Sequence, residues 1–376
     1  MNKWRPVNLG DIAYNIQTGP FGSQLHQSDY SAIGTPVVMP KDLIAGKISE
    51  HSIARVGESH VKRLAKHKIQ SGDILYSRRG DVGRCAYVTE NEVNWLCGTG
   101  CLKITVDPDK ALSKFVFYQL QTSQIVGWVE KHAIGSTMLN LNTSILENIP
   151  LLLPPLEVQQ KIADMLSAYD DLIENNRKQI KLLEEAAQRL YKEWFIDLRF
   201  PGHENTPIVN GIPADWEKTL LGNLIEIKYG KDHKNIPDGN IPVYGSGGFM
   251  RKCLRALHNG EAVLIPRKGS LNNIMYVNEK FWTVDTMFYA LMKRSDIGFF
   301  TYFLLKSFDM YAMNIGAAVP SMTTSILNAI DVVLPNATIL EDFHNNVNAL
   351  FKRVSTLNKQ NDKLMETRNR LLTKLL

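Results

Sequence analysis

The chain repeats itself, and this internal repeat limits the possible fold more than any other feature of its 376 residues. The run Thr143-Ser144-Ile145-Leu146 recurs as Thr324-Ser325-Ile326-Leu327, an offset of 181 in the numbering, and Ile134-Gly135 recurs at the same offset as Ile315-Gly316. Matches at one fixed offset are typical of tandem copies of one structural unit. The sequence therefore predicts two related globular parts.

The front halves of the two copies differ in length. Arg78-Arg79-Gly80 matches Arg267-Lys268-Gly269 at an offset of 189, and Trp4 matches Trp216 at an offset of 212. The fall from 212 to 181 means that the first copy carries 31 extra residues, mostly in its front half. Short β-rich runs punctuated by Gly, Asn and Pro, with shorter helical segments near 114–129 and 298–309, predict an α+β fold for each copy.

A long helical segment follows each globular part. From Ile162 to Trp194 the seam residues are spaced alternately by four and three positions, and the same register returns from Phe343 to Leu375. This is the heptad pattern of a coiled coil, sustained over four and a half repeats. The expected segments are globular parts at 1–155 and 216–336, helices at 156–197 and 337–376, and a junction with three prolines and two glycines at 198–215.

Two polar interruptions of the seams suggest how the helices are directed. Asn176 lies on the first seam and Asn361 on the second. A buried Asn is costly without a hydrogen-bond partner. In an antiparallel pair with aligned centres, the numbers of residues at the same level sum to 537, as 176 and 361 do. We predict an antiparallel coiled coil in which Asn176 faces Asn361; the alternative is that each Asn tolerates a partly wet seam.

Composition is that of a globular protein. Hydrophobic residues make up 44% of the chain and charged residues 22%, and no run approaches the roughly 20 apolar residues of a spanning helix. The first ten residues are not followed by an apolar segment typical of a secretory signal, so we expect a cytoplasmic protein without membrane contact. The four cysteines lack the spacings of a metal site, which predicts buried, reduced thiols and no bound metal.

Charge is unevenly distributed. The net charge is +5. By segment it is +3 for each globular part, −4 for residues 156–215 and +3 for residues 337–376. This distribution is what we expect if the globular parts meet phosphates and the first helix does not. Random scatter of a few charges is the alternative.

The motifs of catalysis are missing. The Pro154-Pro155 pair has neither a polar residue before it nor an aromatic ring after it, as the loop of an amino-methyltransferase would require. No Gly-x-Gly-x-x-Gly follows a strand, and no Walker A loop is found. The sequence therefore predicts no catalytic residue and no cofactor. Two alternatives stay open: a nuclease or methyltransferase with an unrecognised active site, and a coiled-coil adaptor whose globular parts bind protein.

Basic, Gly-rich loops are the remaining candidates for function. Residues 77–84 place three arginines on one turn, and the matching loop 266–273 carries Arg, Lys and two Asn. Arginine suits phosphate or guanine, and an amide suits adenine. A solvated surface turn is the alternative for each loop, but their recurrence in both copies favours binding; Phe281-Trp282 is instead assigned to the core. The candidate DNA-binding residues are Ser23, Gln24, Lys41, Ser77, Arg78, Arg79, Arg84, Ser136, Thr137, Tyr244, Ser246, Arg251, Lys252, Arg267, Lys268, Asn272 and Asn273.

Seven runs carry a resemblance to a known family: Trp4 to Gly10, Gly19 to Ser23, Gly72 to Leu75, Arg78 to Gly83, Ile149 to Ile162, Pro242 to Gly248 and Phe281 to Thr286. Together they resemble the specificity (S) subunits of type I restriction-modification systems. The resemblance covers nearly the whole chain. One departure is Pro335-Asn336-Ala337-Thr338, where the second copy lacks the Pro-Pro-Leu-Glu-x-Gln form of the first.

The resemblance implies a fold and a set of partners. It implies two target recognition domains, each reading half of an asymmetric, bipartite site in double-stranded DNA, and two antiparallel helices that hold the domains apart. It also implies a chain without catalytic residues of its own. The expected partners are two modification subunits, which bind S-adenosylmethionine and methylate adenine, and restriction subunits where these are present.

Overall fold

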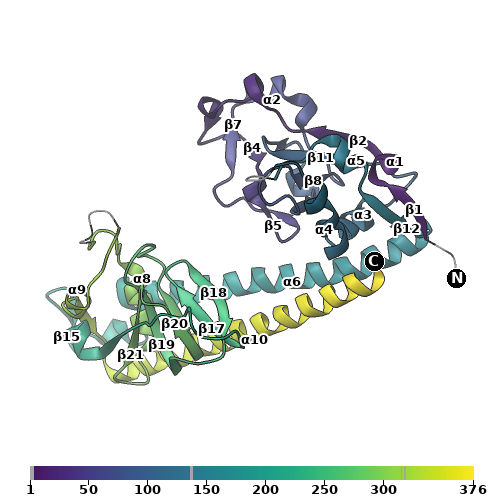
Figure 1. The fold of residues 1–376 in the computed structure, drawn as a ribbon. Coiled ribbons are helices and arrows are strands. Elements are labelled where there is room, and N and C mark those ends of the chain that lie inside the picture. Colours follow the sequence, from purple (N-terminus) through teal and green to yellow (C-terminus); the bar gives the residue numbers. More distant parts are fainter. Residues whose placement is uncertain (1–3, 136–138, 315, 317–318) are drawn as a thin grey trace. The chain divides into compact units, whose positions relative to one another are not determined.

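The computed structural model describes residues 4–135, 139–314, 316 and 319–376. The chain divides into two compact units, one formed by Met1–Asn175 with Gln360–Leu376 and the other by Asn176–Lys359 (Figure 1). We call them unit 1 and unit 2. Each unit mixes helices and sheets, so the expected α+β class is confirmed. The two longest helices each contribute to both units.

Unit 1 is built around an antiparallel sheet in the order β2-β11-β8-β9. A second sheet, β10-β4-β7-β3, comes mostly from the stretch between β2 and β8. The strands are β1 (Arg5–Asn8), β2 (Ala13–Thr18), β3 (Tyr30–Ser31), β4 (Thr35–Val38), β5 (Leu43–Ile44), β6 (Lys47–Ile48), β7 (Ala54–Val56), β8 (Ile74–Ser77), β9 (Cys85–Tyr87), β10 (Leu96–Cys97), β11 (Cys101–Val106) and β12 (Pro150–Leu153), and the α-helices are α1 (Leu9–Ile12), α2 (Glu58–Arg63), α3 (Ser113–Leu120), α4 (Ser123–His132) and α5 (Thr143–Glu147).

Unit 2 contains the same sheet order, β16-β21-β19-β20, extended by β17 and β18 into a six-stranded sheet. β17 pairs with β20 in parallel, whereas its partner β18 is antiparallel. The strands are β13 (Ile208–Val209), β14 (Ile212–Pro213), β15 (Glu217–Leu220), β16 (Ile225–Tyr229), β17 (Ile241–Gly245), β18 (Gly248–Cys253), β19 (His258–Pro266), β20 (Met275–Thr283), β21 (Met287–Met292) and β22 (Asp331–Leu334), and the α-helices are α7 (Leu221–Leu224), α8 (Gly298–Ser307) and α9 (Thr324–Asn328).

Corresponding elements occupy corresponding places in the two units. β1 pairs antiparallel with β12 in unit 1, and β15 pairs antiparallel with β22 in unit 2. The N-cap of α5 is Asn142, whose side chain accepts the Ile145 N–H, and the N-cap of α9 is Thr323, whose side chain accepts the Ile326 N–H. Such N-caps satisfy an otherwise unpaired amide. Asn142 and Thr323 are separated by the same offset of 181, so the sequence repeat is also a repeat of local structure.

The long helices are α6 (Leu156–Tyr191), which ends in a π-helical turn (Lys192–Ile196), and α10 (Ala337–Leu375). Gln159, 1% exposed, accepts the Leu112 N–H and donates to the Pro154 carbonyl, which fixes the start of α6. In the second copy Asn336 accepts the Ile339 N–H instead. A different capping residue therefore replaces the Pro-Pro-Leu-Glu-x-Gln form.

The two long helices contact each other within each unit. In unit 1, Arg368 near the end of α10 donates to Asp170 of α6 (Nη1 to Oδ1, 2.8 Å), and the Tyr118 hydroxyl of α3 donates to the same carboxylate (2.7 Å). In unit 2, the ring of Phe343 near the start of α10 lies 5.9 Å from that of Trp194. The start of α6 thus meets the end of α10, and the end of α6 meets the start of α10.

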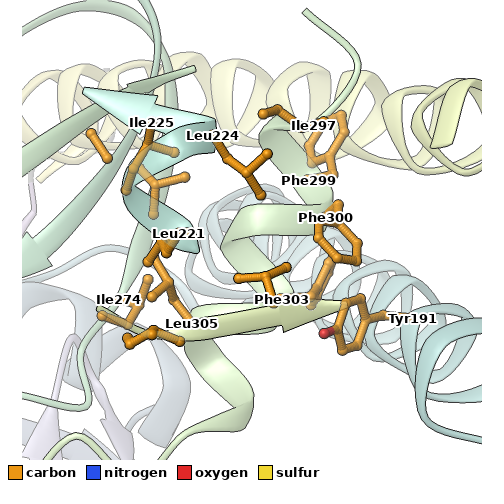
Figure 2. Close-up of a cluster of buried hydrophobic side chains, with 14 of the residues drawn as sticks. Tyr191, Leu221, Leu224, Ile225, Ile274, Ile297, Phe299, Phe300, Phe303 and Leu305 are labelled. Atoms are coloured by element: carbon orange, nitrogen blue, oxygen red, sulfur yellow. The ribbon is translucent and has the colours of Figure 1, made fainter. Parts of the chain in front are cut away.

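An aromatic cluster fills the core of unit 2 against these helices. Figure 2 shows Phe299, Phe300 and Phe303 of α8 in one buried cluster, with Phe300 and Phe303 next to Tyr191 of α6. The Tyr191 ring lies 6.1 Å from that of Phe300 and 5.7 Å from that of Phe303. Burial of such rings contributes about 1.5–3 kcal/mol each. The globular part of unit 2 therefore packs against α6 through apolar contacts between α8 and Tyr191.

Several smaller expectations have a clear outcome. The helix expected near 114–129 is broken at Gln121-Thr122 into α3 and α4, because the Thr122 side chain caps a new helix. Phe281 is fully buried, as expected of the core, whereas Trp282 is half-buried and donates to the Lys231 carbonyl. All four cysteines are buried and free, and burial raises the pKa of Cys85 and of Cys97 to about 12.

Candidate nucleic-acid interface

The first basic loop follows β8 and is pinned to two other segments by main-chain hydrogen bonds. The Arg78 N–H donates to the Gly100 carbonyl (2.7 Å), the Gly80 N–H to the Leu139 carbonyl (3.1 Å), and the Leu141 N–H to the Arg78 carbonyl (2.8 Å). Gly80 has a φ of +75°, a conformation that glycine adopts without a steric cost. The loop is thus a fixed platform rather than a loose turn.

The second basic loop is pinned in the same way. The Arg267 N–H donates to the Thr286 carbonyl (2.8 Å), the Gly269 N–H to the Pro320 carbonyl (3.1 Å), and the Met322 N–H to the Arg267 carbonyl (2.9 Å). Gly269 has a φ of +85°. The bonds join the same parts of the unit as in the first copy, and the loop residues keep the offset of 189 from their counterparts. Both units therefore hold a basic loop on one shared backbone scaffold.

An exposed aromatic ring lies under the first arginine of each loop. The Arg78 guanidinium carbon lies 5.9 Å from the centre of the Phe21 ring, and that of Arg267 lies 5.5 Å from the centre of the Tyr229 ring. Phe21 is 56% exposed and Tyr229 52%. A cation–π contact of this kind orients the planar guanidinium. Burial, with a smaller effect of Arg79, lowers the pKa of Arg78.

The two rings were missed in the sequence. Phe21 lies in the Gly19-Pro20-Phe21-Gly22 stretch that contributed to the resemblance, so its motif was visible but its exposure was not. Tyr229 ends β16 and carries no motif of its own. Phe21 follows β2 and Tyr229 ends β16, and these two strands hold the same place in the shared sheet order. This position brings both rings to the basic loops. Only the fold makes this equivalence visible.

The candidate cations differ in how free they are. Arg79 and Lys268, at equivalent positions, are exposed, and neither forms an ion pair with a residue that the structure describes. Arg84 donates to Asp81 (Nε to Oδ2, 2.6 Å). Lys41 is held by the Ser52 carbonyl (2.8 Å) and by Asp42 (3.2 Å), and Lys252 is exposed. Arg79 and Lys268 on the two loops, and Lys252 on β18, are therefore the candidate cations best placed to meet a phosphate.

Polar candidates in the second copy mostly bond to the protein itself. Asn272 accepts the Met310 N–H (2.8 Å) and donates to Asp309 (3.2 Å). Asn273 donates to the Ser246 carbonyl (2.9 Å), which joins the basic loop to the turn between β17 and β18. The Tyr244 hydroxyl donates to Glu279 (3.1 Å), and burial followed by the Glu279 charge raises the pKa of Tyr244. These side chains shape the surface more than they offer free groups.

Two candidates have positions that argue against direct contact. Ser77 is fully buried, and its hydroxyl donates to the Arg79 carbonyl (3.1 Å), so it stabilises the loop from inside. Arg251 donates to His233 Nδ1, to Asp238 and to the carbonyls of His233 and Ile236. With these bonds its guanidinium ties the strand to the loop before β17, and we leave both residues out of the interface.

Some candidates are not fully described. Ser136 and Thr137 lie outside the described residues. Ser23 is described only as part of a 3₁₀ turn at Gly22–Gln24, and its neighbour Gln24 is half-buried. Within the described ranges, no three His, Cys, Asp or Glu side chains gather as a metal site would require. None of the helices in those ranges has both the length and the apolar character needed to cross a membrane.

Comparisons with known proteins agree on one family. Residues 1–185 and 213–367 match the type I restriction modification DNA specificity domain, which is therefore present twice. The chain is 28% identical to the type I restriction enzyme MjaIX specificity subunit of Methanocaldococcus jannaschii, over 90% of this chain and 85% of that protein. It is 30% identical to the HindI specificity subunit of Haemophilus influenzae over 52% of this chain and 42% of that protein.

The fold has a counterpart among solved structures. The chain aligns over its full length with 96% of the type I restriction-modification S subunit from M. genitalium, with a TM-score of 0.60 and 20% identity. That likeness concerns the fold alone. The family match spans most of the sequence, in two copies that correspond to the two related globular parts. The chain therefore belongs to the specificity subunits of type I restriction-modification systems, the non-catalytic subunits that recognise DNA.

Proposed function

We propose that this chain reads an asymmetric, bipartite DNA sequence, with residues 1–155 and 216–336 as its two target recognition domains. The observation that carries the proposal is the shared loop scaffold, in which three equivalent main-chain hydrogen bonds hold Gly80 and Gly269 in equivalent positions. Each loop presents an arginine on an exposed aromatic ring and a second, free cation. One such scaffold in each unit fits one half-site for each domain.

The side chains on the two scaffolds differ, which supports an asymmetric site. Arg79 corresponds to Lys268, and Arg84 corresponds to Asn273. Arginine binds guanine or phosphate in a bidentate manner, whereas lysine acts as a point charge and an amide pairs best with adenine. Two domains with different side chains on one backbone read two different sequences, where a symmetric dimer would require a palindrome.

The long helices act as a spacer, as an antiparallel coiled coil. The contacting pairs Asp170 with Arg368 and Trp194 with Phe343 have numbers that sum to 538 and 537, next to the 537 expected for this register. The seam residues from Ile162 to Trp194 and from Phe343 to Leu375 are all buried or half-buried. The 36 residues of α6 span about 54 Å, against roughly 34 Å for one turn of DNA.

The chain has partners in this function. Two modification subunits dock on the helices and the adjacent surfaces, and the chain positions DNA so that a modification subunit can extrude and methylate an adenine. Restriction subunits join through them where present. The acidic segment 156–215, with a net charge of −4, suits protein contact better than contact with phosphates.

Methylome mapping tests the proposal most directly. Cells that carry the modification subunit gain one methylated bipartite motif with this chain and lose it without the chain. Replacing residues 1–150 by those of another family member changes one half-site and leaves the other unchanged. Inserting one heptad in each long helix alters the unread gap and leaves both half-sites intact. If the replacement changed both half-sites or neither, the assignment of one half-site to each domain would be wrong.

A further inference from the structure

The hairpin of β17 and β18 in unit 2 is held rigidly at both ends. At its turn, the Ser246 carbonyl accepts the side-chain amide of Asn273 from the basic loop (2.9 Å). A β-carbon built on Gly269 of that loop would lie 3.0 Å from Ser246 Oγ, so loop and turn are in close contact. Along β18, Arg251 ties the strand to His233 and Asp238. The hairpin is therefore a fixed extension of the basic loop.

Two large apolar side chains stand exposed near the turn of this hairpin. Phe249 is 59% exposed and Met250 53%. Tyr244 pairs with Phe249 while Val243 pairs with Arg251, so Met250 is the extra residue of a β-bulge. In a regular strand consecutive side chains point to opposite faces, and a bulge changes their direction. The bulge is what leaves both neighbours exposed.

Contacts with β17 hold Phe249 and Met250 in place. The Phe249 ring lies 6.5 Å from the Tyr244 ring in an edge-on arrangement. A β-carbon on Gly245 would lie 2.6 Å from the Met250 sulfur, so the thioether lies against the backbone of β17 where a larger residue would displace it. These contacts fix two apolar side chains in an exposed position. Their exposure to water is unfavourable for the isolated domain, which is typical of a surface that binds a partner.

Free cations lie on this hairpin and on the basic loop, whereas the nearby carboxylates already have partners: Glu279 accepts from Tyr244, and Asp238 accepts from Arg251. Lys252 lies exposed two residues beyond Met250, and the basic loop that contacts the hairpin turn carries the free Lys268. An apolar pair beside free cations suits a polyanion with an apolar interior better than it suits the apolar surface of a protein. Double-stranded DNA is such a partner, since its stacked bases lie between two lines of phosphates.

We propose that Phe249 and Met250 form a wedge that enters a base step of the DNA bound by the second recognition domain and partly unstacks it. The wedge rests on the proposed function, because the basic loop must first bring DNA to the hairpin. It adds readout of DNA deformability, since pyrimidine–purine steps unstack more readily than others. The second half-site is then selected at a step that no hydrogen bond reads.

The test uses the full chain in complex with its modification subunits and a duplex that carries the mapped site. The variant Phe249→Ala with Met250→Ala is compared with Leu254→Ala, which removes an exposed apolar residue (62%) just beyond β18. Loss of the two apolar contacts weakens binding by about 10–100-fold, because the cost of unstacking a base step offsets part of the burial energy of the two side chains. The salt slope stays unchanged, because no phosphate contact is lost.

Unstacking is read with 2-aminopurine placed in turn at each position of the second half-site other than the methylated adenine. The wild-type complex raises the fluorescence at one base step, and the double Ala variant abolishes the rise while Leu254→Ala keeps it. Phe249→Leu, which retains an apolar side chain, keeps part of it. Thermal melting equal to wild type shows that the variants are folded.

Three outcomes would overturn the wedge. Wild-type fluorescence that stays quenched at every position excludes unstacking, and unchanged affinity in the double variant excludes a contact. Loss of the modification subunits on size-exclusion chromatography, with DNA binding by the remaining complex intact, assigns the pair to a protein interface instead. The proposed function fails separately, if substitution of the basic-loop cations Arg79 and Lys268 leaves DNA binding unchanged.

Discussion

Replacing Arg79 and Lys268 by Ala measures how many phosphates the basic loops hold. Both side chains are exposed and lack an ion-pair partner among the described residues, so each is available for one phosphate. Each lost phosphate contact reduces the slope of log K against log salt by about 0.9. Raising the salt from about 50 to about 200 mM lowers the affinity of every form. The fold-loss is about 3.5 times smaller for each single variant than for wild type, and about 12 times smaller for the double variant.

The assay is fluorescence anisotropy of a labelled duplex with the mapped site, titrated with the complex at four or more salt concentrations. Lys218→Ala is the matched control, because Lys218 is exposed on β15 and lies outside both loops. Arg84→Ala has a smaller effect, since Asp81 already holds that guanidinium at 2.6 Å. If the slopes of the Arg79 and Lys268 variants matched those of wild type and Lys218→Ala, the loops would not touch phosphates.

Three further changes test other parts of the argument. Phe21→Ala and Tyr229→Ala remove the rings under Arg78 and Arg267 and weaken DNA binding by about two- to five-fold, with an unchanged salt slope in the same anisotropy assay. Tyr118→Phe lowers the free energy of unfolding by about 1.5 kcal/mol in urea denaturation, because a hydrogen bond to a charged group is lost. Its effect is not additive with that of Arg368→Ala, since both side chains bind Asp170, and simple additivity would disprove the shared carboxylate. If Asn176 and Asn361 face each other, Asn176→Leu and Asn361→Leu each lower the melting temperature more than the double variant does, because each single change leaves one buried amide without its partner. Independent effects of the two substitutions would favour the partly wet seam.

The helices were predictable because their determinants are local and periodic. Seam residues at alternating spacings of four and three define one face over many turns, and this face is buried or half-buried from Ile162 to Trp194. The start of α10 lacks the Pro-Pro-Leu-Glu-x-Gln form, but Asn336, a residue type favoured at the N-cap, accepts the Ile339 N–H there. The facing of Asn176 and Asn361 stays a prediction; their 8% and 6% exposure agrees with a polar residue on a buried seam.

The candidate site was predictable only in part. The repeat located both basic loops, because Arg78-Arg79-Gly80 and Arg267-Lys268-Gly269 correspond in sequence. Sequence did not separate free from committed cations. Arg251 was chosen for its charge, but it bonds to residues 13 to 18 positions earlier in the chain. Such contacts depend on the path of the preceding loop, which composition does not determine.

The proposed function requires one loop scaffold to serve two specificities, and the bonding of the loops permits this. Each loop is held by main-chain hydrogen bonds, supported by side chains such as Ser77 and Asn273, and none of these bonds uses the side chain of Arg79 or Lys268. Under the proposed function, exchanging those side chains changes recognition while the main-chain bonds of the loop are kept. The exceptions are Gly80 and Gly269, whose φ values of +75° and +85° disfavour any residue with a β-carbon. Under the proposed function, the side chains that determine specificity can vary where main-chain hydrogen bonds hold the loop. Gly80 and Gly269 cannot be exchanged in this way, because another residue would strain the backbone at a positive φ.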